Sequence, residues 1–121
     1  MTRCPIHPTV QAQMDALYAR LPRIACQRRC QRACGPIVMA RLEWQRITDH
    51  LGHTPEGNES LRCPMLAGNH CNVYALRPLI CRLYGLVDDP LMRCHWGCIP
   101  DRWLSRVESY ALMTEMERIA R

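Results

Sequence analysis

The sequence predicts a small, mostly α-helical domain with irregular connections, about four helices and a short β-hairpin around residues 63–75. Three observations support this fold class. Apolar residues recur at helical spacing in segments bounded by Pro or Gly, and a length of 121 residues suits one domain. The chain also contains nine Cys but no Phe, so its core is thin and favours cross-links or bound metal. We therefore expect a metal-stabilised domain.

The first helix is expected to begin near Pro8 and to end at Pro22, because a proline ring cannot continue a helix. Residues 1–7 lack such a pattern, and we expect a flexible N-terminal arm there, followed by a single domain over residues 8–121. The inward positions at helical spacing are Val10, Met14, Leu17, Tyr18 and Leu21, with Asp15 and Arg20 facing outward.

Residues 23–34 form a second candidate helix, with three cysteines along one side. The segment contains no Gly or Pro, and Gly35-Pro36 ends it. Cys26, Cys30 and Cys34 lie four residues apart, so they make one stripe along a helix. Buried thiols can pack like small apolar side chains, but most other positions here are Gln or Arg. We therefore prefer metal ligation to core packing for this stripe.

A third helix is expected within residues 37–52, with Gly52 as its C-cap. His50 and His53 are three residues apart, a spacing that permits ligation, but a solvated helix end is the preferred interpretation. Residues 53–60 have the composition of a surface loop. The apolar positions of the helix are Leu42, Trp44, Ile47 and Leu51.

Residues 63–98 hold five of the nine cysteines. Cys63 and Cys71 belong to the predicted hairpin, which has Gly and Asn at its tip. A short helix is expected to open at Arg77-Pro78, with Pro in its first turn, and to carry Cys81.

The C-terminal part begins with Cys94 and Cys98, which surround Trp96-Gly97 in a predicted turn. The last helix is then expected to start at Pro100-Asp101. Its apolar spacing is typical of a core-facing helix rather than of a cofactor site. The predicted face consists of Leu104, Val107, Ala111, Leu112, Met116 and Ile119.

Eight cysteines remain when Cys4 of the N-terminal arm is set aside. This is twice the number needed for a four-cysteine zinc site or a cubane cluster. The odd total of nine disfavours a closed disulfide framework. The predicted metal ligands are Cys26, Cys30, Cys34, Cys63, Cys71, Cys81, Cys94 and Cys98.

The intervals between these cysteines favour an iron–sulfur cluster, or two clusters, over zinc. Three pairs are separated by three residues and none by two. Sulfurs around a tetrahedral zinc lie about 3.8 Å apart, whereas helical Cβ atoms at this spacing are already about 5–6 Å apart. A cluster is larger because each thiolate binds a different iron. Zinc remains the alternative, since helical His pairs at this spacing do bind one zinc. We expect Arg77 and Arg82 to donate hydrogen bonds to the sulfurs.

All sixteen basic residues are Arg, and the absence of Lys excludes Schiff-base chemistry and P-loop phosphate binding. The formal charge of +5 invites a nucleic-acid interpretation. That charge treats every thiol as neutral, whereas each ion bound by four thiolates carries a net charge of about −2. We therefore expect metal as the partner, leave an unknown protein partner open, and do not expect nucleic acid.

Three motifs resemble the YkgJ-type cysteine-cluster family of zinc- or iron-chelating domains. They are Cys63-Pro64-Met65-Leu66, Cys71-Asn72-Val73-Tyr74 and Arg77-Pro78-Leu79-Ile80-Cys81-Arg82-Leu83, and the resemblance covers roughly residues 26–98. It implies metal chelation by eight cysteines. The family usually opens with closely spaced cysteines ending in a Cys-Cys pair, whereas this chain has only three thiols there and an additional Cys94. The departure leaves open which four thiols share a centre.

The leading hypothesis is thus a cysteine-ligated metal protein used in electron transfer, redox sensing or metal handling. The alternative is a zinc-stabilised module that binds nucleic acid or a protein through the Arg-rich segment 23–34. We do not expect an enzyme, because no paired carboxylate, Ser-His-Asp set or zinc helix is readable around His50, His53, His70 and His95. No apolar run approaches the ~18 residues of a membrane span, and the N-terminus lacks an apolar signal region. We therefore expect a cytoplasmic protein with no membrane partner.

Overall fold

The computed structural model describes residues 4–24, 39–53, 66–67, 70–71, 74–94 and 97–121. Within these ranges it has four α-helices: α1 (Pro8–Ala19), α2 (Arg41–Leu51), α3 (Leu79–Leu83) and α4 (Arg106–Ile119). A 3₁₀ turn, η1 (Tyr74–Leu76), precedes α3, and the two-residue strands β1 (Leu66–Ala67) and β2 (His70–Cys71) pair antiparallel. The mostly helical class is confirmed. A hairpin over residues 63–75 is not established, because much of that stretch lies outside the described residues.

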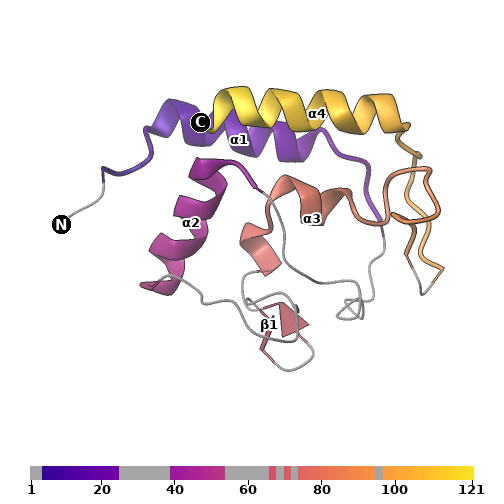
Figure 1. The fold of residues 1–121 in the computed structure, drawn as a ribbon, viewed down its shortest axis with the longest axis horizontal. Coiled ribbons are helices and arrows are strands. Elements are labelled where there is room, and N and C mark those ends of the chain that lie inside the picture. Colours follow the sequence, from indigo (N-terminus) through magenta and orange to yellow (C-terminus); the bar gives the residue numbers. More distant parts are fainter. Residues whose placement is uncertain (1–3, 25–38, 54–65, 68–69, 72–73, 95–96) are drawn as a thin grey trace.

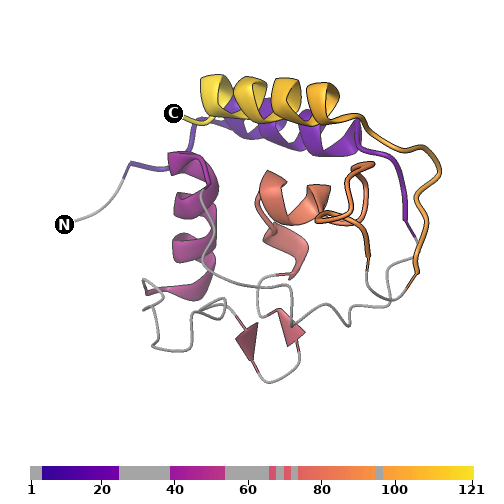
Figure 2. The same ribbon diagram turned by 45° about the vertical axis from the view of Figure 1, so that its right-hand side comes forward.

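Helices α1 and α4 lie side by side and antiparallel, and α2 and α3 lie against one side of this pair (Figures 1 and 2). The C-terminus returns to the start of α2, where the Leu42 amide donates to the Ala120 carbonyl at 3.0 Å. At the other terminus, Gln45 Nε2 of α2 donates to the Cys4 carbonyl at 2.7 Å, so both ends of the described chain contact α2. Residues 84–94 and 97–105 form the opposite end of the molecule (Figure 1).

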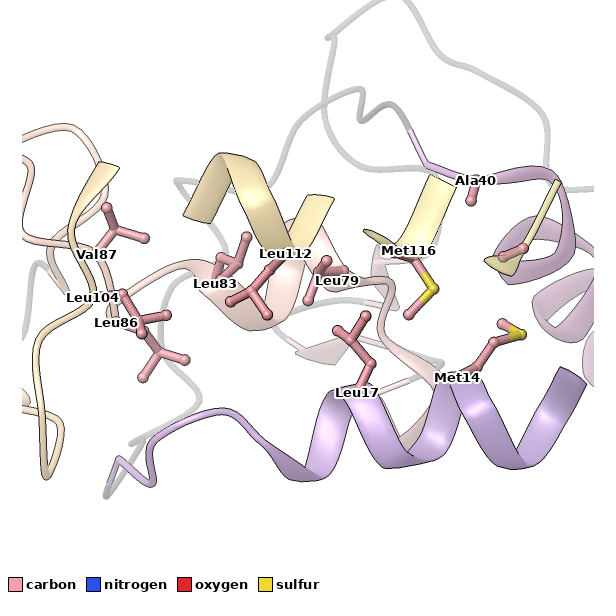
Figure 3. Packing of buried hydrophobic residues seen from close by; sticks show 11 residues of the cluster. Met14, Leu17, Ala40, Leu79, Leu83, Leu86, Val87, Leu104, Leu112 and Met116 are labelled. Atoms are coloured by element: carbon pink, nitrogen blue, oxygen red, sulfur yellow. The ribbon is translucent and has the colours of Figure 1, made fainter. Parts of the chain in front are cut away.

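The core lies where α1, α3 and α4 face one another (Figure 3). The predicted inward face of α1 is confirmed: Met14 and Leu17 are fully buried, and the other three positions pack against the same cluster. Asp15 and Arg20 are exposed, as expected. The partners of α1 in this cluster are Leu79 and Leu83 of α3 and Leu112 and Met116 of α4.

The last helix begins later than predicted. Leu104 is extended, because its amide donates to the Leu86 carbonyl and its carbonyl accepts from the Asp88 amide, both at 2.8 Å. The helix therefore starts after Ser105 rather than at Pro100-Asp101. This register places Val107 on the solvent side, 78% exposed, so its assignment to the apolar face was wrong.

Ser105 caps α4 through reciprocal hydrogen bonds with Glu108. The Glu108 amide donates to Ser105 Oγ at 3.1 Å, and the Ser105 amide donates to the Glu108 carboxylate at 3.2 Å. Replacing Ser105 with Ala is expected to lower the free energy of unfolding by about 1 kcal/mol, because one first-turn amide loses its acceptor. Urea unfolding followed by circular dichroism measures this loss. An unchanged midpoint would show that the cap contributes nothing.

Helix α2 keeps its predicted C-cap, since Gly52 is left-handed with φ of 76°. The helix begins at Arg41, and only Ile47 of its four predicted apolar positions is fully buried. Its other buried residues are polar: Glu43, Gln45 and Thr48 are 3–4% exposed. The apolar spacing therefore missed three of the four buried residues of α2. His50 and His53 are exposed at the helix end, as expected.

Residues 25–38 lie outside the described part, and with them most of the predicted helix over 23–34. Its first two residues are not helical. Ile24 forms an antiparallel bridge with Pro100, and the Asp101 amide donates to the Arg23 carbonyl at 2.8 Å. A helix in this segment therefore cannot begin at residue 23.

Candidate metal centre

Helix α3 carries Cys81, a half-buried cysteine. The amides of Cys81 and Arg82 both donate to the Pro78 carbonyl, at 3.0 and 3.1 Å. Pro78 is the N-cap of the helix, one position before the first turn in which the sequence placed it. With only five residues, α3 is too short to be stable alone and depends on tertiary contacts.

The carboxylate of Glu43 supplies those contacts. Its Oε2 accepts from the Leu79 amide, at the first residue of α3, and from the Tyr18 hydroxyl, both at 2.6 Å. Its Oε1 accepts from the Ala40 amide at 3.2 Å. Burial and the hydrogen bond to Glu43 raise the pKa of Tyr18 above its usual range, so this hydroxyl remains a donor. One buried carboxylate thus joins α1, α2 and the start of α3.

Arg82 follows Cys81 and is held in place from two sides. Its guanidinium lies over the Tyr18 ring, 3.9 Å from the ring centre. Its Nε donates to the Arg77 carbonyl at 2.6 Å and its Nη2 to the Ala75 carbonyl at 3.1 Å. Burial of the guanidinium lowers the pKa of Arg82. The described hydrogen bonds of Arg82 therefore go to backbone, and the expected bonds from Arg77 and Arg82 to sulfur stay a prediction.

Cys94 and Cys98 are also half-buried. Between them Gly97 adopts φ of 76°, and its amide donates to the Cys94 carbonyl at 3.2 Å, so the chain turns between the two cysteines. Gly85, two residues after the end of α3, lies close to Cys94. A Cβ atom on Gly85 would lie 3.2 Å from Ile24 Cδ1 and 3.8 Å from Cys94 Cβ. The end of α3, Ile24 and Cys94 are therefore in close contact.

This contact brings cysteine-bearing segments together that are far apart in the sequence. Ile24, which pairs with Pro100, stands two positions before Cys26, and Pro100 stands two positions after Cys98. The chain therefore enters residues 25–38 directly beside the end of the Cys94–Cys98 turn. The predicted ligands in residues 25–38 lie outside the described residues, and the structure places only Ile24, the residue from which the chain enters that segment.

The structure places the side chains of three predicted ligands, Cys81, Cys94 and Cys98. For Cys71 it gives only the backbone, in β2 opposite Leu66. Across the described ranges, no group of three or more His, Cys, Asp or Glu forms a metal site. The remaining predicted ligands lie outside those ranges: Cys26, Cys30, Cys34 and Cys63.

Replacing Gly85 with Ala tests the contact beside Cys94. We expect a loss of about 1–3 kcal/mol in the free energy of unfolding, because φ of 90° strains any residue with a Cβ. The added methyl group would also press on Ile24 at 3.2 Å. The matched control is Gly52→Ala, which has a similar φ of 76° but nothing within 4 Å of the added atom. Equal losses in the two variants, measured by urea unfolding, would show that the contact with Ile24 has no importance.

The described residues define a small, mostly helical domain in which Cys81, Cys94 and Cys98 are half-buried. Residues 25–102 match the CxxCxxCC family, described as a putative zinc- or iron-chelating domain. Because this match covers more than half of the chain, the protein belongs to that family, which confirms the cysteine-cluster family suggested by the motifs. No curated protein and no solved structure gave a match. In the described part of the chain, every helix is too short or too polar to cross a membrane.

Proposed function

We propose that this protein binds metal through the thiolates of eight cysteines, in keeping with the description of its family. The observation that carries the proposal is the pairing of Ile24, two residues before Cys26, with Pro100, two residues after Cys98. Half-buried thiols near this junction would contribute little stability as apolar core residues, because their side chains are small. As metal ligands they would fasten the two segments together.

The donor set suits the metals in the family description. Thiolates are soft ligands that select zinc and iron–sulfur clusters over hard cations. The three described thiols do not complete a site alone, so the proposal needs Cys26, Cys30, Cys34 and Cys63, together with Cys71. A hairpin around residues 63–75 would present Cys63 and Cys71 to the same centre. A bound cluster would supply one-electron chemistry, and the protein residues would hold it and tune it.

We favour iron–sulfur over zinc because the cysteine pairs are separated by three residues. An iron–sulfur cluster suits a role in electron transfer, redox sensing or metal handling. We propose that a single domain over residues 8–121 performs this role in the cytoplasm. The zinc-stabilised module that binds a partner through residues 23–34 is the alternative, and those residues lie almost wholly outside the described part. We propose no catalytic residue.

Purification without oxygen decides between the two metals. We expect a brown protein with broad absorption near ~400 nm and with iron and acid-labile sulfide in comparable amounts, as thiolate-bound clusters require. A colourless protein with stoichiometric zinc would overturn the iron–sulfur assignment and leave cysteine ligation intact. A colourless protein without zinc or iron would overturn the proposed function itself.

A further inference from the structure

A cavity of about 320 Å³ opens beside the end of α3. Its walls come from Tyr18 and residues 21–24, from Arg77, Arg82 and residues 84–86, and from Cys94. This volume is at the lower end of the range for small-molecule sites, about 300–1,000 Å³. The cavity therefore has room for a small organic molecule.

The polar part of the cavity is positively charged. Arg23, Arg77 and Arg82 contribute to its walls, and among the described residues no Asp or Glu does. Within the described residues, neither Arg23 nor Arg82 forms a salt bridge. Arg82 has five N–H groups, and two of them donate to carbonyls of the chain. Hydrogen-bond donors with positive charge are thus left for a ligand.

The carboxylate of Glu43, which accepts from the wall residue Tyr18, already has its hydrogen bonds. The Glu43 carboxylate accepts three hydrogen bonds and does not line the cavity. Tyr18 stays protonated because burial and Glu43 raise its pKa, so its hydroxyl adds no negative charge.

The remaining wall is apolar or aromatic, and it includes Leu21, Ile24, Leu86 and the ring of Tyr84. Such walls favour a ligand with an apolar body. They disfavour a multiply charged phosphate, which costs more to remove from water than a single carboxylate. The planar guanidinium also matches a carboxylate in a two-point hydrogen bond.

We propose that this cavity binds a small carboxylate with an apolar body, held at its charged end by Arg82 and Arg23. The cavity is lined by protein residues, so the contacts proposed for the ligand involve no metal ion. It adds a small-molecule ligand to a chain whose family description concerns metal alone. Because Cys94 is part of the wall, such a ligand would sit beside one of the proposed metal ligands.

The test is a titration of the protein as purified, with benzoate as the probe, followed by amide NMR. We expect saturable shifts at Ile24, Gly85 and Leu86, and binding at least tenfold weaker for benzamide, which has the same body without the charge. Inorganic phosphate is expected to bind at least tenfold more weakly than benzoate. The metal content of each sample is measured alongside, so that loss of the ligand site and loss of metal are read separately.

Two variants test whether Arg82 and Arg23 bind the carboxylate group of the ligand. Arg82→Gln and Arg23→Gln are each expected to weaken benzoate binding about tenfold, and Arg23 is exposed, so its replacement leaves folding intact. Arg102→Gln is the control, because Arg102 pairs with Glu108 on α4 and lies outside the cavity; it should bind benzoate like the wild type. Equal binding of benzoate and benzamide, shifts confined to other residues, or unchanged affinity in Arg23→Gln would each overturn the proposal. Phosphate binding as tight as benzoate would refute the carboxylate class.

Discussion

Replacing Glu43 with Ala is expected to lower the free energy of unfolding by about 3–5 kcal/mol, one of the two largest effects anticipated in this protein. The carboxylate is 3% exposed and accepts hydrogen bonds from Tyr18, Leu79 and Ala40. Its removal leaves three donors without an acceptor in a place that water barely reaches. A buried donor without a partner costs about 1–3 kcal/mol, and small domains have only about 5–15 kcal/mol in total.

The matched variant is Glu43→Gln, which has the same shape. Its amide oxygen can still accept from Tyr18 and Leu79, while its NH₂ group faces the Ala40 amide and loses that bond. We expect a loss of about 1–2 kcal/mol in this variant. Urea unfolding of both variants and the wild type gives the comparison. A loss below about 1 kcal/mol in Glu43→Ala would show that these three hydrogen bonds do not hold α3.

Replacing Cys81 with Ser is expected to remove metal and folded protein together. In a small domain, metal binding contributes folding free energy directly, on the scale of about 10–16 kcal/mol for structural zinc. Cys81 lies on α3 together with the core residues Leu79 and Leu83, so the loss of this ligand is expected to destabilise the whole core. We expect metal content well below wild type and most of the chain in the insoluble fraction.

The control for this variant is Cys4→Ser. Cys4 is exposed and is not among the eight predicted ligands, although its carbonyl accepts from Gln45 Nε2 at 2.7 Å. Because that bond uses the backbone, the substitution should leave metal content and solubility unchanged. Wild-type metal content in Cys81→Ser would remove Cys81 from the ligand set, and loss of metal in Cys4→Ser would add a ninth thiol to it.

Helices with clear apolar spacing could be predicted from the sequence. The face of α1 and the Gly52 cap followed from side-chain spacing and from backbone preference, which are both local properties. The start of α4 was missed because Leu104 pairs with residues 86 and 88, a tertiary contact that overrides a local helix signal. The Ser105-x-x-Glu108 pattern was a readable signal for the true start.

Glu43 was missed for a different reason. A glutamate three residues into a helix is usually a solvated charge, and its burial here depends on donors from α1 and α3 that no local pattern reveals. The same holds for the pairing of Ile24 with Pro100, which joins positions 76 residues apart. The cysteine family was readable, by contrast, because its motifs are short and contiguous. Sequence motifs thus identified the family, and tertiary contacts decide how the segments meet.

Native mass spectrometry of the protein purified without oxygen, combined with thiol alkylation, tests the central claim most directly. We predict a mass above that of the polypeptide by whole clusters or ions, lost on acidification. We also predict that one of the nine cysteines, Cys4, reacts with the alkylating reagent before acid and all nine react after it. A mass equal to that of the bare chain, with most thiols reactive from the start or paired in disulfides, would contradict metal ligation by these eight cysteines.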